Sequence, residues 1–279
     1  DEGGSIYSAT LTSEALTNMV TLDGTQVAMG RYPNAGSNLS FESHSGTSSI
    51  TDNQMTSTPN WTGAELVINV DDWSLDRCSI SNHSGTTFTF TNLGAGDEPE
   101  NNRYYFIQND IRTLDVANEW FHNTSTGKFF IYGNPSSKTV KVATLNYLIS
   151  NSGYDYINIA GLNLTGAIKY AIYMPYGSDY CSVQSCSVSM VGENGIFGDT
   201  QNYCTYNQNT INNCNRAGVF FNSSGHLTII NNSFFNIGLV PGQAYRPSQS
   251  VGIYTYNINN SLIQYNSISN TAYNGIYFT

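Results

Sequence analysis

Hydrophobic and polar positions repeat with a period of about 23 residues over residues 156–279, which is a period typical of solenoids. Each unit contains two short β-prone runs that are separated by Asn, Gly and Ser. No run reaches the roughly ten residues of helical periodicity that a helical repeat requires. The pattern therefore predicts that this part of the chain forms the stacked coils of a parallel β-helix.

When the units are stacked, apolar residues share columns in every coil, as residues that point into a core must. The first column contains Leu164, Val188, Ile211, Phe234 and Ile268. The second contains Ile172, Ile196, Val219, Ile253 and Ile276. A column of small residues precedes the second one and predicts a tight bend; it contains Ala171, Gly195, Gly218, Gly252 and Gly275.

Asparagines form two further columns. One contains Asn209, Asn232 and Asn266, and the other contains Asn213, Asn236 and Asn270. Strands of adjacent coils lie about 4.8 Å apart, so amides in one column can bond to each other and to the backbone of the bends. We expect both columns to belong to the scaffold.

Residues 1–139 precede the coils and contain β-prone runs, an Asp23-Gly24 hairpin signal and stretches of strict alternation. We expect them to form a β-rich segment that packs on the helix and caps it, because an open solenoid end exposes unpaired strand edges. Residues 140–279 are expected to be the coils. Since the last strand has no capping element, we also expect the coils to continue beyond Thr279 in the native protein.

Composition narrows the class of protein and of partner. Only 11% of residues are charged, while 20 Tyr and 13 Phe are present, which suits a β-solenoid or a secreted protein and not a disordered chain. The net charge of −10 argues against a nucleic-acid partner and makes a polyanionic glycan a poorer substrate. No run of about 18 apolar residues is present, so no membrane span is predicted.

The order of these motifs resembles a group of secreted right-handed β-helix proteins, many of which are bacterial glycoside hydrolases. The residues that carry the resemblance are Asp23, Gly24, Arg31, Tyr32, Pro33, Asn34, Leu114, Asp115, Glu119, Trp120, Gly127 and Tyr132. The resemblance covers most of the chain, but its motifs mark the architecture more than an activity. It implies a right-handed helix whose catalytic carboxylates would lie on coils beyond the first few.

Four acidic residues follow Asn151, namely Asp155, Asp179, Glu193 and Asp199. A glycosidase needs two carboxyl groups about 5 to 9.5 Å apart. Glu193 aligns between Lys169 and Arg216, which predicts a structural ion ladder. Glu193 and Asp199 flank one strand about 20 Å apart, so they form no pair. Asp199 stays as the catalytic candidate, and we expect that the catalytic carboxylates lie outside this sequence.

The five cysteines and four histidines have no metal-ligand spacing, so neither a metal nor a cofactor is predicted. Cys181 and Cys204 share a column in adjacent coils. Their positions permit a disulfide, but buried free thiols are the preferred interpretation.

The residue after the second apolar column is aromatic in every coil. These residues are Tyr173, Phe197, Phe220, Tyr254 and Tyr277. Strand alternation predicts that they point outward, where their rings could stack on sugars. The insertion from Leu239 to Ser250 carries Tyr245 and Arg246, and long loops on rigid scaffolds often bind ligands. We take all seven residues as candidates for substrate binding.

The sequence thus predicts a secreted or cell-surface protein that acts on a polysaccharide or another glycan. One hypothesis is a glycoside hydrolase, of which this chain would be the N-terminal part. The alternative is a non-catalytic adhesin or surface-filament module on the same scaffold.

Overall fold

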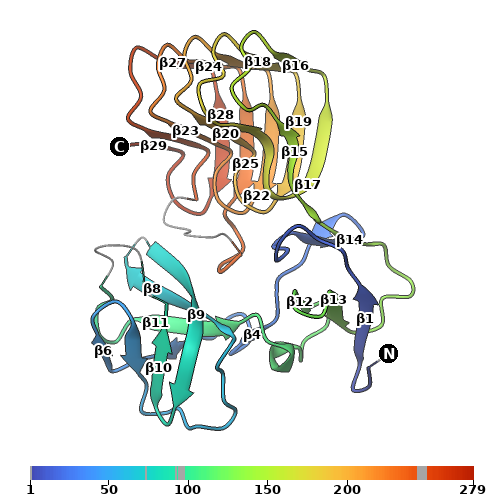
Figure 1. The fold of residues 1–279 in the computed structure, drawn as a ribbon, viewed down its shortest axis with the longest axis vertical. Coiled ribbons are helices and arrows are strands. Elements are labelled where there is room, and N and C mark those ends of the chain that lie inside the picture. The colour runs from blue at the N-terminus through green and yellow to red at the C-terminus, as the bar shows by residue number, and fades with distance from the viewer. Residues whose placement is uncertain (1, 73, 92, 94–97, 244–249) are drawn as a thin grey trace. The chain divides into compact units, whose positions relative to one another are not determined.

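The computed structural model describes residues 2–72, 74–91, 93, 98–243 and 250–279, and Figure 1 shows its fold. The described chain divides into two compact units. The first contains residues 2–11 and 27–139, and the second contains residues 12–26, 140–243 and 250–279. Within the described residues, no helix is long and apolar enough to cross a membrane.

The first unit is built from two antiparallel sheets. The smaller one has the order β1 (Ile6–Thr10), β13 (Lys128–Tyr132) and β12 (Trp120–Asn123). The larger one has the order β4 (Arg31–Tyr32), β11 (Tyr104–Gln108), β8 (Glu65–Asp71), β9 (Ser74–Ser84), β10 (Thr87–Phe90), β7 (Ser49–Thr51) and β6 (Ser43–Ser45), and β5 (Leu39–Ser40) also pairs with β11. A single 3-10 turn, η1 (Ile111–Thr113), follows β11. Alternation of side chains along the strands of the larger sheet puts Leu66, Ile68, Phe88 and Tyr105 into its core.

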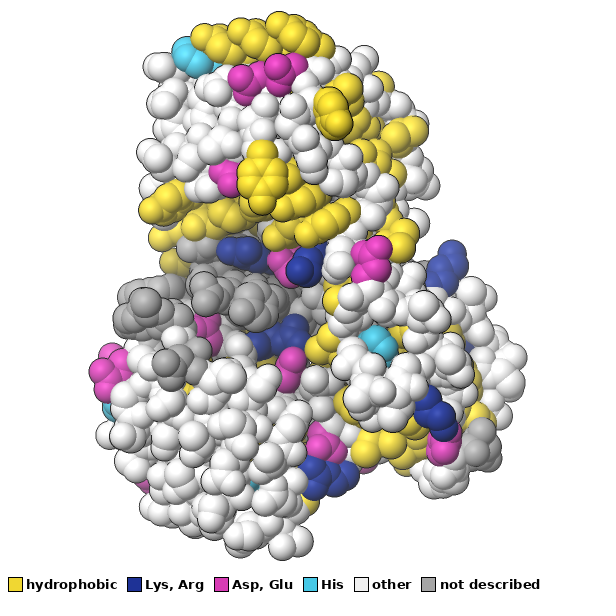
Figure 2. Space-filling view, viewed as in Figure 1, with side chains coloured by type: hydrophobic (Ala, Val, Ile, Leu, Met, Phe, Trp, Pro, Cys, Tyr) yellow, Lys and Arg dark blue, Asp and Glu magenta, His cyan; other side chains and the backbone are white. Residues whose placement is uncertain are grey.

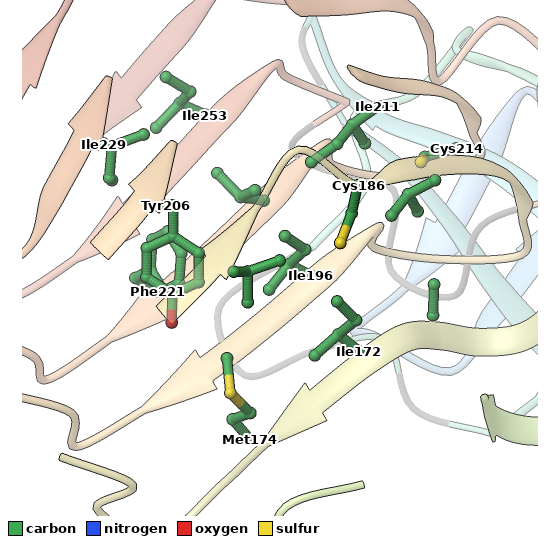
Figure 3. Close-up of a cluster of buried hydrophobic side chains, with 14 of the residues drawn as sticks. Ile172, Met174, Cys186, Ile196, Tyr206, Ile211, Cys214, Phe221, Ile229 and Ile253 are labelled. Atoms are coloured by element: carbon green, nitrogen blue, oxygen red, sulfur yellow. The ribbon is translucent and has the colours of Figure 1, made fainter. Parts of the chain in front are cut away.

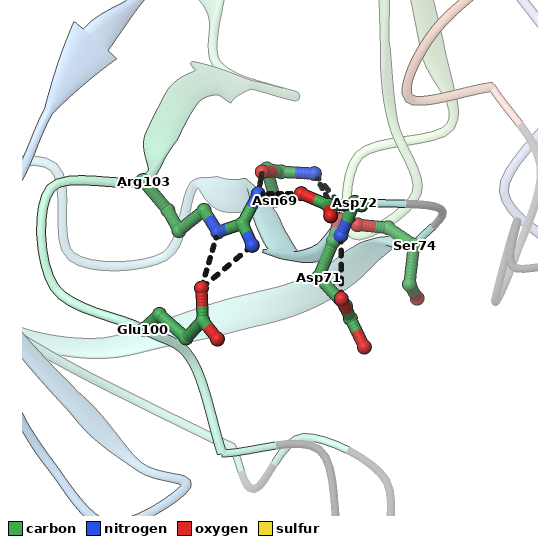
Figure 4. Close-up of polar contacts among 6 residues, drawn as sticks. All are labelled: Asn69, Asp71, Asp72, Ser74, Glu100 and Arg103. Atoms are coloured by element: carbon green, nitrogen blue, oxygen red, sulfur yellow. Dashed lines mark hydrogen bonds and ion pairs between the residues drawn. The ribbon is translucent and has the colours of Figure 1, made fainter.

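Polar side chains close the turn between β8 and β9 in the first unit (Figure 4). The Asn69 Nδ2 donates to the backbone oxygens of Asp71, at 2.6 Å, and Ser74, at 3.1 Å. Arg103 bridges Asp72 and Glu100, with N–O distances of 2.6 Å to each. These charges therefore pair with each other and hold a turn.

The second unit is a parallel β-solenoid with three faces (Figure 1). The first face is the five-stranded sheet of β16 (Asn158–Ala160), β18 (Ser182–Gln184), β21 (Thr205–Asn207), β24 (Thr228–Ile230) and β27 (Leu262–Gln264). The second face contains the start of β17 (Asn163–Met174), β19 (Ser187–Val191), β22 (Thr210–Cys214), β25 (Ser233–Ile237) and β28 (Ser267–Thr271). The third contains β15 (Leu145–Ser150), the end of β17, β20 (Ile196–Asp199), β23 (Val219–Asn222), β26 (Ile253–Tyr256) and β29 (Ile276–Phe278).

Strand pairing confirms both apolar columns predicted from the sequence. Leu164, Val188, Ile211, Phe234 and Ile268 are paired in that order on the second face. Ile172, Ile196, Val219, Ile253 and Ile276 are paired on the third. Except for Ile276, which is 38% exposed, their side chains belong to one core between the faces (Figure 3). At Gly218, the column of small residues leaves no room for a larger side chain. A Cβ there would lie 2.6 Å from the Gly252 oxygen of the next coil.

The first asparagine column forms the hydrogen-bonded ladder that the sequence predicted. The Oδ1 of Asn232 accepts from the backbone N–H of Asn209 at 2.9 Å and from its Nδ2 at 3.0 Å. The Oδ1 of Asn266 accepts the same two bonds from Asn232, both at 2.9 Å. Cys186 continues the column, since its N–H donates to the Oδ1 of Asn209. The ladder therefore joins successive coils through buried amides.

Residues 12–26 lie along the flank of the coils. Their hairpin of β2 (Val20–Leu22) and β3 (Thr25–Gln26) pairs with β14 (Val140–Val142), and the turn residues Asp23 and Gly24 both have positive φ. The Nδ2 of Asn18 donates to the Gly192 oxygen at 3.0 Å, and the Nδ2 of Asn215 donates to the Asn18 oxygen at 2.8 Å. This part of the expected N-terminal segment is thus tied to two successive coils, those of Gly192 and Asn215.

All five cysteines are buried and free. At the bend that leads from the third face to the first, the Sγ of Cys204 accepts a hydrogen bond from the backbone N–H of Cys181 at 3.4 Å. The preference for free thiols over a Cys181–Cys204 disulfide is confirmed.

Candidate functional site

An aromatic row runs along the outside of the third face. It contains Tyr173, Phe197, Phe220, Tyr254 and Tyr277, which are paired in that order. Each follows a residue of the inward isoleucine and valine column, so alternation directs the rings away from the core. We call this set the outward aromatic row.

The rings of the outward aromatic row pack against one another and stack on two further tyrosines. Tyr147 stacks on Tyr173 with ring centroids 4.2 Å apart, and Tyr170 stacks on Phe197 at 4.9 Å. Phe197 and Phe220 are inclined at 83°, which interrupts the stack. Of the contacts between neighbours in the row, this one is the most strongly inclined, so the row is not one continuous stack. The sequence analysis missed both tyrosines. Tyr147 precedes residue 156, where the repeat begins, and Tyr170 lies where β17 bends from the second face to the third.

The expectation that Tyr254 is exposed was wrong. Its side chain is 6% exposed and packs with Ala217 and Val251. Phe220 stacks on it at 4.4 Å, and Tyr277 lies against the same cluster. The accessible part of the row is therefore formed by the half-buried rings of Tyr173, Phe197, Phe220 and Tyr277. Tyr245 and Arg246 lie outside the described residues.

A row of charged residues borders the outward aromatic row at the bend. Lys169, Glu193 and Arg216 are in register, since the Glu193 N–H donates to the Lys169 oxygen and the Arg216 N–H donates to the Glu193 oxygen. The predicted alignment is therefore present, but Glu193 is only 7% exposed and so is not a surface residue. The Arg216 guanidinium lies 5.3 Å from the Phe220 ring centroid. Burial, followed by the nearby Glu193 carboxylate, raises the pKa of Tyr170, so its phenol stays neutral.

Two carboxylates lie in register at the bend between the third and first faces. The Oδ1 of Asp155 accepts from the backbone N–H of Asp179 at 2.9 Å, and the Oδ1 of Asp179 accepts from the Asn202 N–H at 2.7 Å. Adjacent strands lie about 4.8 Å apart, so the two carboxyl groups are spaced by about 5 Å, as in retaining glycosidases. We call them the acid pair. The sequence analysis overlooked it, although 24 residues, about one coil, separate its members.

Asp199, the catalytic candidate from the sequence, lies elsewhere. It ends β20 on the third face, where its Oδ1 accepts from the Nδ2 of Asn222 at 2.8 Å. Its register partner in the next coil is Asn222, which is not an acid. Asp199 therefore has a polar position beside the outward aromatic row but no carboxylate partner in that column.

A second aromatic row was not predicted. Tyr156, Tyr180, Tyr203 and His226 stack with centroid distances of 5.0, 5.0 and 4.5 Å and interplanar angles of 4° to 6°. We call these four residues the turn ladder. Its tyrosines are 73%, 49% and 50% exposed. Figure 2 shows two rows of hydrophobic side chains along the solenoid, with acidic side chains between them. The signal was present in the sequence, because these residues begin four successive repeat units.

Among the described residues, no group of three or more His, Cys, Asp and Glu side chains could hold a metal ion.

Comparison with known proteins supports the parallel β-helix fold. A family model described as the right handed beta helix region matches residues 145–279. The coils form a right-handed β-helix. A solved structure titled glycoside hydrolase aligns with 100% of this chain and 80% of its own, with a TM-score of 0.53 and 11% identity. At that identity the likeness concerns the fold alone.

Two further solved structures match with lower TM-scores. One is the tailspike protein of Pseudomonas phage LKA1, with a TM-score of 0.22, 10% identity, and coverage of 80% of this chain and 34% of its own. The other is the catalytic domain of a GH87 alpha-1,3-glucanase in complex with tetrasaccharides, with a TM-score of 0.21, 12% identity, and coverage of 100% and 62%. No curated protein matches the chain.

Proposed function

We propose that the protein acts on carbohydrate and holds a glycan chain against the outward aromatic row. The observation that carries the proposal is the row itself, with half-buried rings on a rigid face and a break in their stacking between Phe197 and Phe220. Asp199 and Asn222 lie in register beside it and offer hydrogen-bonding groups to sugar hydroxyls. The fold shared with a solved glycoside hydrolase is consistent with this function.

The test is glycan binding by the protein and by a Phe197→Ala variant. A screen of oligosaccharides identifies a bound glycan, and calorimetry then measures its affinity. Since an aromatic contact contributes on the order of 1 kcal/mol, we expect Phe197→Ala to weaken binding about fivefold to tenfold. Phe235→Ala is the matched control, because Phe235 points outward from the second face in register with Asn212 and Ser269. Equal losses in both variants, or no binding of any glycan, would contradict the proposal.

Hydrolysis is a second candidate, and the acid pair favours it. The estimated spacing of about 5 Å suits one carboxyl group as general acid and the other as nucleophile. If the protein cleaves a glycan, Asp155→Asn and Asp179→Asn should each lower the rate by orders of magnitude while the fold is retained, since an amide oxygen can still accept the backbone N–H. Release of reducing ends measures this. Binding without any cleavage would instead identify an adhesin-like module.

A secreted or cell-surface location is part of this proposal, because an accessible polysaccharide lies outside the cell. Fractionation of the producing cells, with detection of the chain in the medium or on the surface, tests it. Recovery only with the cell interior would reject it.

A further inference from the structure

Two neighbouring columns at the bend between the third and first faces differ from the rest of the scaffold in the same coils. The first is a polar column that begins with the acid pair and continues through Asn202, Gly225 and Asn259. The second is the turn ladder, whose residues each follow a member of the first column, with Asn260 in the last coil. The acid pair and the turn ladder thus form one surface, which we call the bend surface.

Backbone conformation does not explain the aromatic residues of the turn ladder. Tyr156, Tyr180, Tyr203 and His226 have φ between 52° and 60°, and Asn260 at the equivalent place has φ 46°. Glycine and asparagine adopt this left-handed region with the least strain, whereas other side chains meet their own backbone. The fifth coil carries the residue that the backbone favours, but the first four carry exposed rings that add nothing to the core.

Scaffold bonding does not explain the charge of the acid pair either. Each Asp uses its Oδ1 to accept the N–H of the next coil. An Asn side chain would accept the same bond, and Asn202 and Asn259 occupy this column in later coils. Two carboxylates at strand spacing repel each other, and within the described residues neither of them takes part in an ion pair. The charge is therefore retained at a cost to the scaffold.

We propose that the bend surface binds a glycan that carries free amino groups. The proposal rests on the proposed function and names the class of sugar. Two carboxylates without a cationic partner are complementary to protonated amines, while the ring edges and phenol hydroxyls of the turn ladder contact the sugar backbone. Because the ring faces are stacked on each other, this contact is made by edges and hydroxyls. In the two coils that carry the acid pair, one Asp and one ring recur about every 4.8 Å, which is close to the length of one sugar unit.

The experiment compares ligands of equal length on the intact chain. Fully deacetylated glucosamine oligosaccharides are the probe, and the N-acetylated oligosaccharides and oligolysine are the comparisons. We expect the amine-bearing sugar to bind about tenfold more tightly than its acetylated form at low salt, with the difference shrinking as salt screens the charges. The double variant Asp155→Asn with Asp179→Asn should remove that difference, and Tyr180→Asn, which restores the residue type of position 260, should weaken binding.

The control removes two exposed carboxylates from the first unit, Glu98→Gln with Asp115→Asn, and should leave the affinity within about twofold. Melting temperatures verify that each variant is folded. Equal affinity for amine-bearing and acetylated sugars would overturn the inference, and if Phe197→Ala still weakened binding, the proposed function would stand. Equal affinity for oligolysine would show recognition of charge alone and overturn the glycan assignment.

The catalytic explanation of the acid pair makes a different prediction. If the double variant abolishes cleavage of a neutral glycan but leaves the affinity for the amine-bearing sugar unchanged, the charge serves hydrolysis and the inference is wrong. If no glycan binds at all, both the proposed function and this inference are wrong.

Discussion

Replacing Asn232 by Leu tests the hydrogen-bonded ladder at its centre. The Asn232 side chain is 2% exposed. Its Oδ1 accepts two bonds from Asn209, and its Nδ2 donates to the Tyr206 oxygen at 2.9 Å and to the Oδ1 of Asn266 at 2.9 Å. Leucine makes none of these four bonds.

The magnitude follows from which groups lose their partners. The backbone N–H of Asn209 is buried and loses its acceptor, which costs about 1–3 kcal/mol. Its Nδ2 keeps one bond, to the Val183 oxygen at 2.9 Å, and the Oδ1 of Asn266 keeps the N–H of residue 232. These weaker losses add about 1 kcal/mol, so we expect Asn232→Leu to lower the free energy of unfolding by about 2–4 kcal/mol.

Urea unfolding followed by far-UV circular dichroism measures this change. All three tryptophans lie between residues 61 and 120, so tryptophan fluorescence reports separately on the first unit. Asn212→Leu is the control, because Asn212 is outward and in register between Ser189 and Phe235; it should change stability by no more than about 0.5 kcal/mol. Equal midpoints for the wild type and Asn232→Leu would refute the ladder as a source of stability.

Three further predictions concern packing, protonation and thiol reactivity. Gly218→Ala should destabilise the coils by about 1–3 kcal/mol, because its Cβ would lie 2.5 Å from Cδ1 of Phe234; Gly275→Ala in the same column, with its nearest contact at 3.7 Å, should be tolerated, and equal urea midpoints would contradict this. Burial lowers the pKa of His83, so between that pKa and about 6.5 the unfolded chain binds a proton that the folded chain does not. Stability should therefore fall as the pH falls through this window, and His83→Gln should make the fall smaller; an unchanged pH profile of urea midpoints would exclude the contribution. Burial raises the pKa of Cys204 to about 12, so iodoacetamide should label it at neutral pH only after unfolding, and rapid labelling of the native protein in mass spectrometry would contradict its burial.

Properties that repeat from coil to coil could be predicted from the sequence, whereas properties that depend on distant neighbours could not. The inward columns and the Asn209–Asn232–Asn266 ladder follow from the period alone, since each coil places equivalent residues alike. The burial of Tyr254 depends on Ala217, which belongs to another coil. The hydrogen bond between Asn18 and Gly192 joins residues 174 positions apart, and no local sequence pattern indicates it.

The candidate site shows the same division. The outward aromatic row was found because alternation indicates which way a strand residue points. The turn ladder was overlooked although its residues begin the units, because turn positions are expected to hold Asn or Gly and aromatic residues there were not compared between coils. The acid pair required the register of the bend, which the strand columns do not define.

The hydrogen-bonded asparagine ladder also bears on how this chain could acquire new surfaces. Asn232 follows Asn209 by 23 positions and Asn266 follows Asn232 by 34, yet the hydrogen bonds between their side-chain amides have the same length within 0.1 Å. The backbone rejoins the previous coil on both sides of the longer stretch, with the Gly238 N–H bonded to the Cys214 oxygen and the Val251 N–H to the Arg216 oxygen. A coil can thus gain residues at this bend without disturbing the coils that follow. The bend is therefore a suitable position for inserting foreign loops. Sequence variation there could change which ligand is bound while the coils keep their structure.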